Sequence, residues 1–228
     1  MNKHTKTIIK RTSVTLLGLA VVVGIAYQTW LFSVHTVIPN SIYRSAQLPT
    51  SILKKAIQAK EIKTIINLRG SNPDDPWYQK EFNLSQEMNV KHYDVTLSSY
   101  LLPRQEYLRK LVYFLMTAPH PILLHCLSGS DRSGLAAAIA MILSGNTSLP
   151  ESEHQFSFAY FVTAQNSIGK QVFSYYVHWL KKNHLNNNRV NFLKWMCTKN
   201  PMNQENRNYS SFDTYPYNDL FLKEVCHY

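Results

Sequence analysis

A cysteine and an arginine with five residues between them stand in the stretch HCLSGSDRSG, residues 125–134. If a strand ends at His125 and a helix begins near Ser133, the backbone N–H groups between them have no helical partner. Such donors at the positive end of a helix form an anion-binding site, and Gly129 allows the backbone to approach the anion closely. The residues expected to bind a phosphate are Leu127, Ser128, Gly129, Ser130, Asp131 and Arg132.

Cys126 and Arg132 would supply the chemistry of this site. The planar guanidinium of Arg132 matches two oxygens of a phosphate, which a lysine cannot do. A helix N-terminus and a neighbouring cation lower the pKa of a thiol from about 8.5 to roughly 3.5–7.5, so Cys126 is expected to be a nucleophilic thiolate at neutral pH. The competing interpretation, a cysteine that is only a small buried apolar side chain, leaves the glycine, the arginine and the following helix unexplained.

Alternating apolar segments predict the elements that position this stretch. Strands are expected at about 42–44, 63–68, 90–97 and 120–126, with helices beginning at 50 or 51 and spanning 77–88, 104–117 and 133–145. Further helices are predicted after residue 149, and the chain from Asn200 onwards is expected to be extended or partly disordered. The alternation favours an α/β fold with a mostly parallel central sheet flanked by helices, whose ligand site lies at the carboxyl ends of the strands.

The order histidine, cysteine, five residues, arginine, serine, glycine is also the signature of the protein-tyrosine-phosphatase superfamily, and residues 125–134 match it completely. IYRSAQLP at residues 42–49 and TIINLRG at 64–70 resemble segments of compact bacterial dual-specificity phosphatases. The resemblance implies that Cys126 attacks phosphorus and forms a cysteinyl-phosphate, while Arg132 and the loop amides hold the oxygens. It further implies that Ser133 helps the thiolate to leave and that His125 orders the loop.

A general acid must protonate the leaving oxygen, and the resemblance places an aspartate one strand and one helix before the nucleophile. Asp94, 32 residues before Cys126, is the first candidate, although Trp-Pro-Asp is absent there. Asp131, inside the cysteine loop, is the second candidate, and a mechanism that uses neither stays open. Arg44 and Arg69 follow or end predicted strands and could reach the substrate or pair with surface acids.

The N-terminus has the composition of a membrane segment. Residues 13–32 are 20 mostly apolar residues without a charge, and four Lys or Arg residues precede them. This length crosses a bilayer as a helix, and the charge bias keeps the N-terminus cytoplasmic and the main domain extracytoplasmic. We expect a single-pass anchor in the inner membrane, whereas cleavage near GIA at 24–26 would give a secreted or periplasmic protein.

The rest of the composition narrows the class of protein. The net charge is +10, of which four charges precede the apolar segment, and no Lys/Arg-rich block follows, so nucleic acid is not an expected partner.

Cys197 and Cys226 could pair in an oxidising compartment, which would leave Cys126 as the free thiol. Cysteine and histidine spacings predict no metal site, and no cofactor is expected. The oligomeric state is not indicated.

These observations predict three regions of the chain. They are a basic cytoplasmic stub with the membrane anchor (or signal peptide) at 1–33, a phosphatase domain at 34–165, and a helical extension with an irregular tail at 166–228. We predict a membrane-anchored extracytoplasmic phosphatase of phosphotyrosine, phosphoprotein or other phosphate monoesters. Alternatives are a phosphatase of a lipid or small-molecule phosphate, a phosphate-binding module without activity, and a rhodanese-like sulfurtransferase.

Overall fold

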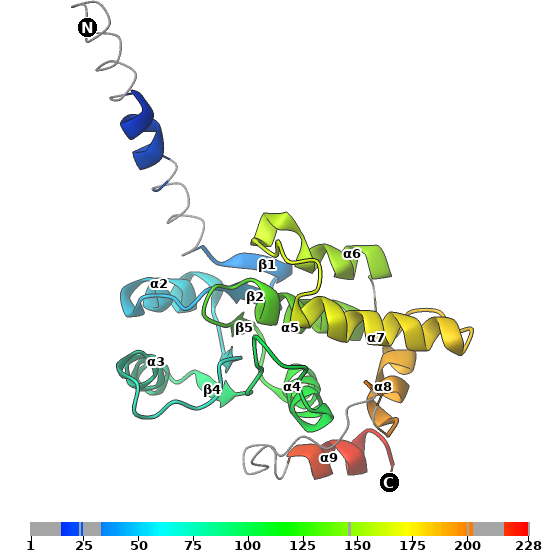
Figure 1. Cartoon of the computed structure of the whole chain (residues 1–228). Coiled ribbons are helices and arrows are strands. Elements are labelled where there is room, and N and C mark those ends of the chain that lie inside the picture. The colour runs from blue at the N-terminus through cyan, green and yellow to red at the C-terminus, as the bar shows by residue number, and fades with distance from the viewer. Residues whose placement is uncertain are drawn as a thin grey trace, which may run out of the picture.

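The computed structural model of the chain describes residues 15–22, 24, 33–145, 147–199, 201–202 and 217–227 (Figure 1). Five strands form one sheet in the order β1-β2-β5-β3-β4. The strands are β1 (His35–Ile38), β2 (Ile42–Ser45), β3 (Thr64–Asn67), β4 (Lys91–Asp94) and β5 (Ile122–His125). The helices are α2 (Thr50–Lys60), α3 (Pro76–Glu87), α4 (Gln105–Thr117), α5 (Asp131–Ser144), α6 (Leu149–Glu153), α7 (Ile168–Lys182), α8 (Arg189–Cys197) and α9 (Tyr217–Glu224), with 3₁₀ turns η1 (His154–Phe156) and η2 (Phe158–Tyr160).

The sheet is mostly parallel, as the sequence predicts. β2, β5, β3 and β4 run parallel, and β1 pairs antiparallel with β2. Parallel strands are apolar on both faces because helices cover both faces. Alternate side chains therefore serve different layers: Ile65 and Leu123 pack with α2 and α3, whereas Ile66 and Leu124 pack with α4 and α5. The carboxyl ends of the four parallel strands consequently meet at one edge, called here the catalytic edge.

α5 is the central helix of the larger core. Its sequence is apolar nearly all round, and ten of its residues are buried. It contacts β2 and β5 on one side and α4, α6, α7 and α8 on the others, and Figure 1 shows α5 in the middle of these helices. Because α5 is held on every side, the loop that joins β5 to its first turn has fixed ends.

Two elements differ from the sequence prediction. The edge strand β1 precedes the first strand expected from the sequence, and the last residues expected to be irregular contain α9. Periodicity does not reveal α9 because its stability comes from distant partners: Phe221 is completely buried in the core, and α9 packs along α4. Residues 203–216 lie outside the described part of the chain.

The anchor expected at residues 13–32 falls largely outside the described residues. Within that segment, residues 15–22 are helical and their large apolar side chains are more than half exposed. A search of the described part of the chain finds no helix with the length and apolar character needed to span a bilayer.

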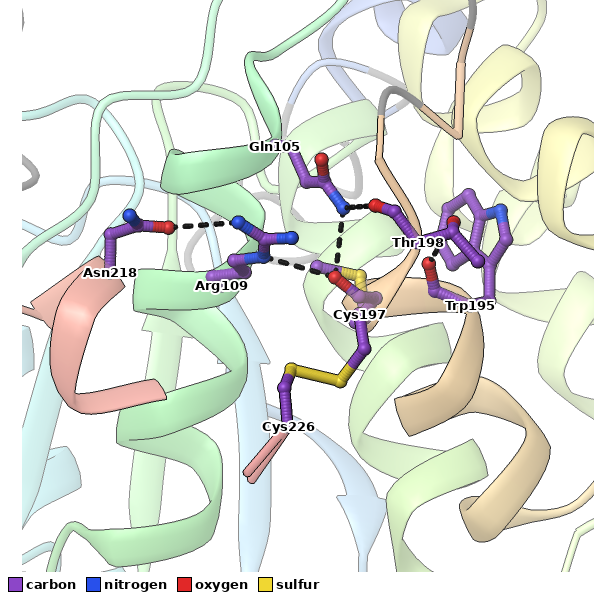
Figure 2. The surroundings of a disulfide bond; sticks show 8 residues. Gln105, Arg109, Trp195, Cys197, Thr198, Asn218 and Cys226 are labelled. Atoms are coloured by element: carbon purple, nitrogen blue, oxygen red, sulfur yellow. Dashed lines mark hydrogen bonds between the residues drawn. A yellow bond between two sulfur atoms is a disulfide. The ribbon is translucent and has the colours of Figure 1, made fainter. Parts of the chain in front are cut away.

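A disulfide joins Cys197 at the end of α8 to Cys226 after α9, and Cys126 is the free cysteine. Figure 2 shows how α4 supports the same region: Arg109 donates from Nη1 to Oδ1 of Asn218 at 3.1 Å, and Gln105 donates from Nε2 to the carbonyl oxygen of Thr198 at 2.6 Å. The C-terminal segment is thus fixed both covalently and by polar contacts, and the pairing considered from the sequence is confirmed.

The cross-link closes a chain segment with a sequence separation of 29, and the entropy of loop closure predicts a contribution of about 3.5 kcal/mol to stability. Cys226→Ser should lower the unfolding free energy by about that amount in urea titrations. Reductant should produce the same loss in the wild type and no further loss in the variant. An unchanged unfolding midpoint for the reduced wild-type protein would contradict this role.

Candidate active site

The cysteine loop lies at the catalytic edge, between the end of β5 and the start of α5. Cys126 is the first residue after β5 and is 1% exposed. The loop is tied to both neighbouring strands: the N–H of Leu68 donates to the carbonyl oxygen of His125 at 2.8 Å, and the N–H of Gln47 donates to that of Leu127 at 3.1 Å. The position of Cys126 is therefore fixed by hydrogen bonds to the chain that follows both neighbouring strands.

Gly129 makes the tight curvature of the loop possible. Its φ of 71° lies in the left-handed region, and a Cβ at this position would lie 2.6 Å from the backbone N of Ala46 and 2.8 Å from the carbonyl carbon of Ser45. Both contacts are with backbone and are closer than real Cβ atoms approach. Glycine is therefore required for conformation and for space.

Arg44 is the main support of the loop. This side chain is fully buried, and its Nη2 donates to the carbonyl oxygens of Gly129 at 2.7 Å and Ser130 at 2.8 Å. Its Nη1 donates to the carbonyl oxygen and to Oε1 of Gln155, both at 2.9 Å, and the guanidinium lies 4.0 Å from the ring centre of Tyr160. Burial lowers the pKa of Arg44 to about 10. Arg44 thus neither reaches substrate nor pairs on the surface, because the loop carbonyls surround it.

Because Arg44 binds the carbonyl oxygens of Gly129 and Ser130, the N–H groups of the loop are left to bind an anion on its opposite side. Burial raises the pKa of the Cys126 thiol, but the charge of Arg132 and hydrogen bonds from Ser133 and from the N–H of Gly129 lower it more, and the net pKa lies below its ordinary value. The guanidinium of Arg132 also donates from Nη1 to the carbonyl oxygen of Leu97 at 3.3 Å. The structure therefore brings Cys126, Arg132 and Ser133 together as one anion-binding group that favours a thiolate.

His125, the residue before the nucleophile, belongs to a buried network that the sequence did not reveal. Its Nε2 lies 2.8 Å from Oε1 of Glu81, and Nε2 of His92 lies 3.0 Å from the same oxygen. Burial lowers the pKa of His125, yet the charge of Glu81 and its hydrogen bond raise it above its ordinary value. Conversely, burial raises the pKa of Glu81, and the two imidazoles bring it well below its usual range.

Arg69 is a second cation near the loop. Its guanidinium lies 3.6 Å from the ring centre of Trp77 and donates from Nη1 to Oε1 of Gln47 at 3.3 Å. Burial and the positive charge of Arg132 lower the pKa of Arg69, and the thiol of Cys126 acts in the opposite direction. The charges of Asp75 and Glu81 also raise the pKa of Arg69, and they do so more than the thiol does. Arg69 therefore lies near acidic side chains as well as near the anion site, and the structure does not choose between the two roles considered from the sequence.

The two candidate acids have different surroundings. Asp94 ends β4 and is opposite Asn67, which is itself opposite His125 on β5. Its carboxyl accepts from Nδ2 of Asn67 at 2.8 Å and from the hydroxyl of Tyr78 at 2.5 Å. Burial and this hydrogen bond raise the pKa of Tyr78 to about 12.

The Asp131 carboxyl is directed at the beginning of α7. Its Oδ1 accepts from the hydroxyl of Ser167 at 2.6 Å, and both oxygens lie 3.0 Å from the N–H of Gly169. Asp131 therefore satisfies one backbone donor, the N–H of Gly169, and the hydroxyl of the N-cap residue Ser167 at the N-terminus of α7. Its carboxyl joins α5 to α7, while its backbone begins α5 directly after the cysteine loop.

No metal site emerges from the described residues: they contain no group of three or more His, Cys, Asp or Glu side chains arranged to hold an ion. The site instead combines a buried thiol of lowered pKa, a guanidinium and loop amides, which together suit the binding of one small anion. These are the parts of a cysteine-based phosphatase.

The comparisons with known proteins agree with this class. Residues 31–215 match the tyrosine phosphatase family. The chain belongs to the tyrosine phosphatase family and is a cysteine-based phosphatase of the tyrosine or dual-specificity type. No curated protein gives a significant sequence match.

Two solved structures show the shared fold. The core catalytic domain of the PP-IP phosphatase SIW14 from S. cerevisiae is 23% identical, with 66% of this chain and 92% of that chain covered and a TM-score of 0.52. The active form of Tk-PTP is 15% identical, with 62% and 94% covered and a TM-score of 0.50.

Gly129→Ala tests whether the loop must keep this shape. The added methyl group would displace the loop against the β2 backbone, and a displacement of about 1 Å can lower catalysis about 10²-fold. We expect such a loss in kcat/KM on p-nitrophenyl phosphate. Gly145→Ala is the matched control, because Gly145 also has a positive φ, of 79°, but nothing lies within 4 Å of its Cβ position. Equal activities of the two variants would contradict the argument.

Glu81→Gln tests the buried network. Removing the charge leaves His125 without its anionic partner, and breaking a buried pair lowers stability by about 3 kcal/mol or more. Because the pKa of His125 is raised in the folded protein, its positive charge stabilises the fold fully below about pH 6.5, the ordinary pKa of histidine. This stabilisation is lost as the pH rises through the folded-state pKa of His125. Because the pKa of Glu81 is lowered, its contribution is full above about pH 4.5.

Urea titrations of wild type and Glu81→Gln should therefore differ most near pH 5.5 and less near pH 9. Lys54 and Glu87 form an exposed pair at 2.8 Å, so Glu87→Gln provides the control and should change stability by less than about 1 kcal/mol. A loss of stability for Glu81→Gln that is equal at both pH values would be inconsistent with a charged pair.

Proposed function

We propose that this protein is an extracytoplasmic, membrane-anchored phosphatase that hydrolyses phosphate monoesters of the phosphotyrosine or phosphoprotein type through a cysteinyl-phosphate intermediate. The observation that carries the proposal is the buried Cys126, whose pKa is lowered beside Arg132 and loop amides. These groups match a phosphate that has three non-bridging oxygens, and they are held in place before a substrate arrives. Such preorganised charge stabilisation is the main requirement of the reaction.

In the first step, the sulfur of Cys126 attacks phosphorus. The S–P bond forms as the P–O bond to the leaving group breaks, and the general acid gives its proton to the departing oxygen. Arg132 and the loop amides hold the non-bridging oxygens, which carry the charge throughout. Arg44 contributes indirectly, because its hydrogen bonds to Gly129 and Ser130 fix the orientation of those amides.

In the second step, water attacks the cysteinyl-phosphate. The O–P bond forms, the S–P bond breaks, and the carboxylate left by the acid takes the proton of the water. The hydroxyl of Ser133, which hydrogen bonds to the thiol, stabilises the departing thiolate. Inorganic phosphate leaves and the thiolate is restored.

Asp94 is our choice for the acid. It lies on the catalytic edge two strands from β5, or about 10 Å across the sheet. Its side chain is 16% exposed, so a leaving group can approach it. The carboxyl of Asp131 is instead occupied at the N-terminus of α7. Tyr78 and Asn67 orient Asp94 and have to release one oxygen of its carboxyl during the reaction.

Two features support the location. A charge-free apolar segment follows a basic N-terminus, which keeps the N-terminus cytoplasmic. The disulfide between Cys197 and Cys226 suits an oxidising compartment outside the cytoplasm. The proposal therefore places the catalytic domain outside the inner membrane, with residues 13–32 as the anchor.

The proposal is tested with the full chain in detergent and p-nitrophenyl phosphate as substrate, between pH 5 and 7. Wild type should release p-nitrophenol, Cys126→Ser should be inactive, and acid quenching should trap phosphate on Cys126. Binding of phosphate without turnover would indicate a phosphate-binding module. Sulfur transfer from thiosulfate without phosphate release would indicate the sulfurtransferase.

The same assay assigns the acid. Asp94→Asn should lower kcat about 10²-fold, and more for phosphotyrosine than for p-nitrophenyl phosphate, because the poorer leaving group needs the proton more. Asp131→Asn should chiefly lower thermal stability, with kcat within about threefold, since it loses contacts to α7. A larger kcat effect in Asp131→Asn than in Asp94→Asn would exchange the two roles.

A further inference from the structure

The direction of β1 determines where the N-terminal apolar segment joins the domain. β1 is antiparallel to β2, with His35 opposite Arg44 and Ile38 opposite Ile42. The beginning of β1 therefore lies beside the carboxyl end of β2, at the catalytic edge. Only Ser33 and Val34 separate β1 from the apolar segment that ends at residue 32, and two residues span at most about 7 Å. The apolar segment thus enters the domain on the side of the cysteine loop.

Exposed aromatic side chains lie next to this entry point. The ring of Tyr160 in η2 contacts the ring of His35 at 5.6 Å between centres and the guanidinium of Arg44 at 4.0 Å. Phe158 and Phe161 flank Tyr160 in sequence and are 73% and 38% exposed. Amphipathic and aromatic side chains at such positions are typical of a membrane–water interface.

The other side of the catalytic edge is also apolar and exposed. Leu127 in the cysteine loop is 58% exposed. Tyr100 and Leu101 are 87% and 38% exposed, and they belong to the loop that follows β4. That loop borders the site, because the carbonyl oxygen of Leu97 accepts from Arg132. The apolar groups therefore stand on both sides of the phosphate site.

We propose that the catalytic edge docks on the bilayer surface and that the enzyme, in addition to phosphotyrosine- or phosphoprotein-type monoesters, dephosphorylates lipids carrying a phosphomonoester headgroup. The short link holds this edge against the membrane, the aromatic groups of η2 and the Tyr100 loop enter the interface, and Arg132 and Arg69 meet the phosphate of a lipid lying in the same plane. This substrate class rests on the phosphatase activity and the anchor proposed above. A bilayer fits better than a protein partner because the chain itself continues from this edge into an apolar segment of 20 residues.

The opposite edge provides a control. Arg189 at the start of α8 lines a cavity of about 230 Å³ together with Ser41 and His120, which precede β2 and β5. The beginning of α8 therefore lies at the amino ends of the parallel strands. Val190 on this helix is 61% exposed, so it resembles Phe158 in exposure but faces away from the expected membrane.

The experiment uses the full chain in phosphatidylcholine vesicles that contain phosphatidic acid. Phosphate release from the lipid is compared with turnover of p-nitrophenyl phosphate by the same vesicles. The double variant Phe158→Ser with Tyr100→Ser should lose about tenfold or more of lipid turnover, as the burial of two aromatic groups predicts, and should keep soluble turnover within about twofold. Val190→Ser should change neither rate.

A second arm tests the geometry without substituting any residue of the domain. A rigid spacer of 20 prolines between Ser33 and Val34 would extend about 60 Å and lift the domain from the surface. Lipid turnover should fall by at least the same factor, with soluble turnover unchanged. Lipid turnover that survives both the spacer and the aromatic substitutions would overturn the proposal.

The outcomes separate the two proposals. Absence of p-nitrophenyl phosphate turnover in wild type would defeat the phosphatase function itself. Turnover of the soluble ester without lipid hydrolysis would defeat only the docking proposal. The proposal would equally fall if a phosphotyrosine peptide, and not the lipid, lost turnover in the aromatic variants, because the exposed groups would then serve a protein substrate.

Discussion

The buried guanidinium of Arg44 is the contact on which the site depends. Two carbonyl oxygens of the cysteine loop accept from its Nη2, and Gln155 accepts from its Nη1. A loop whose carbonyls are held inward presents its N–H groups outward, which is the arrangement an anion requires. Burying a cation is unfavourable unless its donors find acceptors. Here the loop accepts from Nη2 and Gln155 accepts from Nη1, while Nε is buried without a partner among the described residues. The shape of the loop and the burial of Arg44 are therefore mutually dependent.

A second buried charge with compensating partners lies behind the nucleophile. Glu81 is held by two imidazoles, one of them belonging to His125, the residue before Cys126. A protonated His125 and the nearby Arg132 both favour the thiolate electrostatically. The sheet brings these groups together because β5 is central, with β2 and β3 as its neighbours. Because β5 lies between two strands, residues of both neighbouring strands can hold the loop that follows it.

Sequence alone predicted the parts that are encoded locally. The spacing of Cys126 and Arg132, the glycine between them and the apolar run of α5 predicted the loop and its helix, and the alternation of segments predicted the parallel sheet. Arg44 was named from the sequence, but its support of the loop was not predicted, and Glu81 was missed altogether, since the partners of both residues are far away in the chain. Likewise, the carboxyl of Asp131 is occupied because α7 packs beside α5, and α9 is stable because Phe221 reaches the core.

The pH dependence of Cys126 alkylation tests the central claim most directly. In the structure, the pKa of the Cys126 thiol is lowered by Arg132, Ser133 and the N–H of Gly129, which are in place without substrate. Iodoacetamide should therefore react with a midpoint below that of an ordinary cysteine, inorganic phosphate should protect the thiol, and Arg132→Ala should move the midpoint upward. A midpoint near 8.5, the ordinary value for cysteine, with no protection by phosphate, would contradict the account.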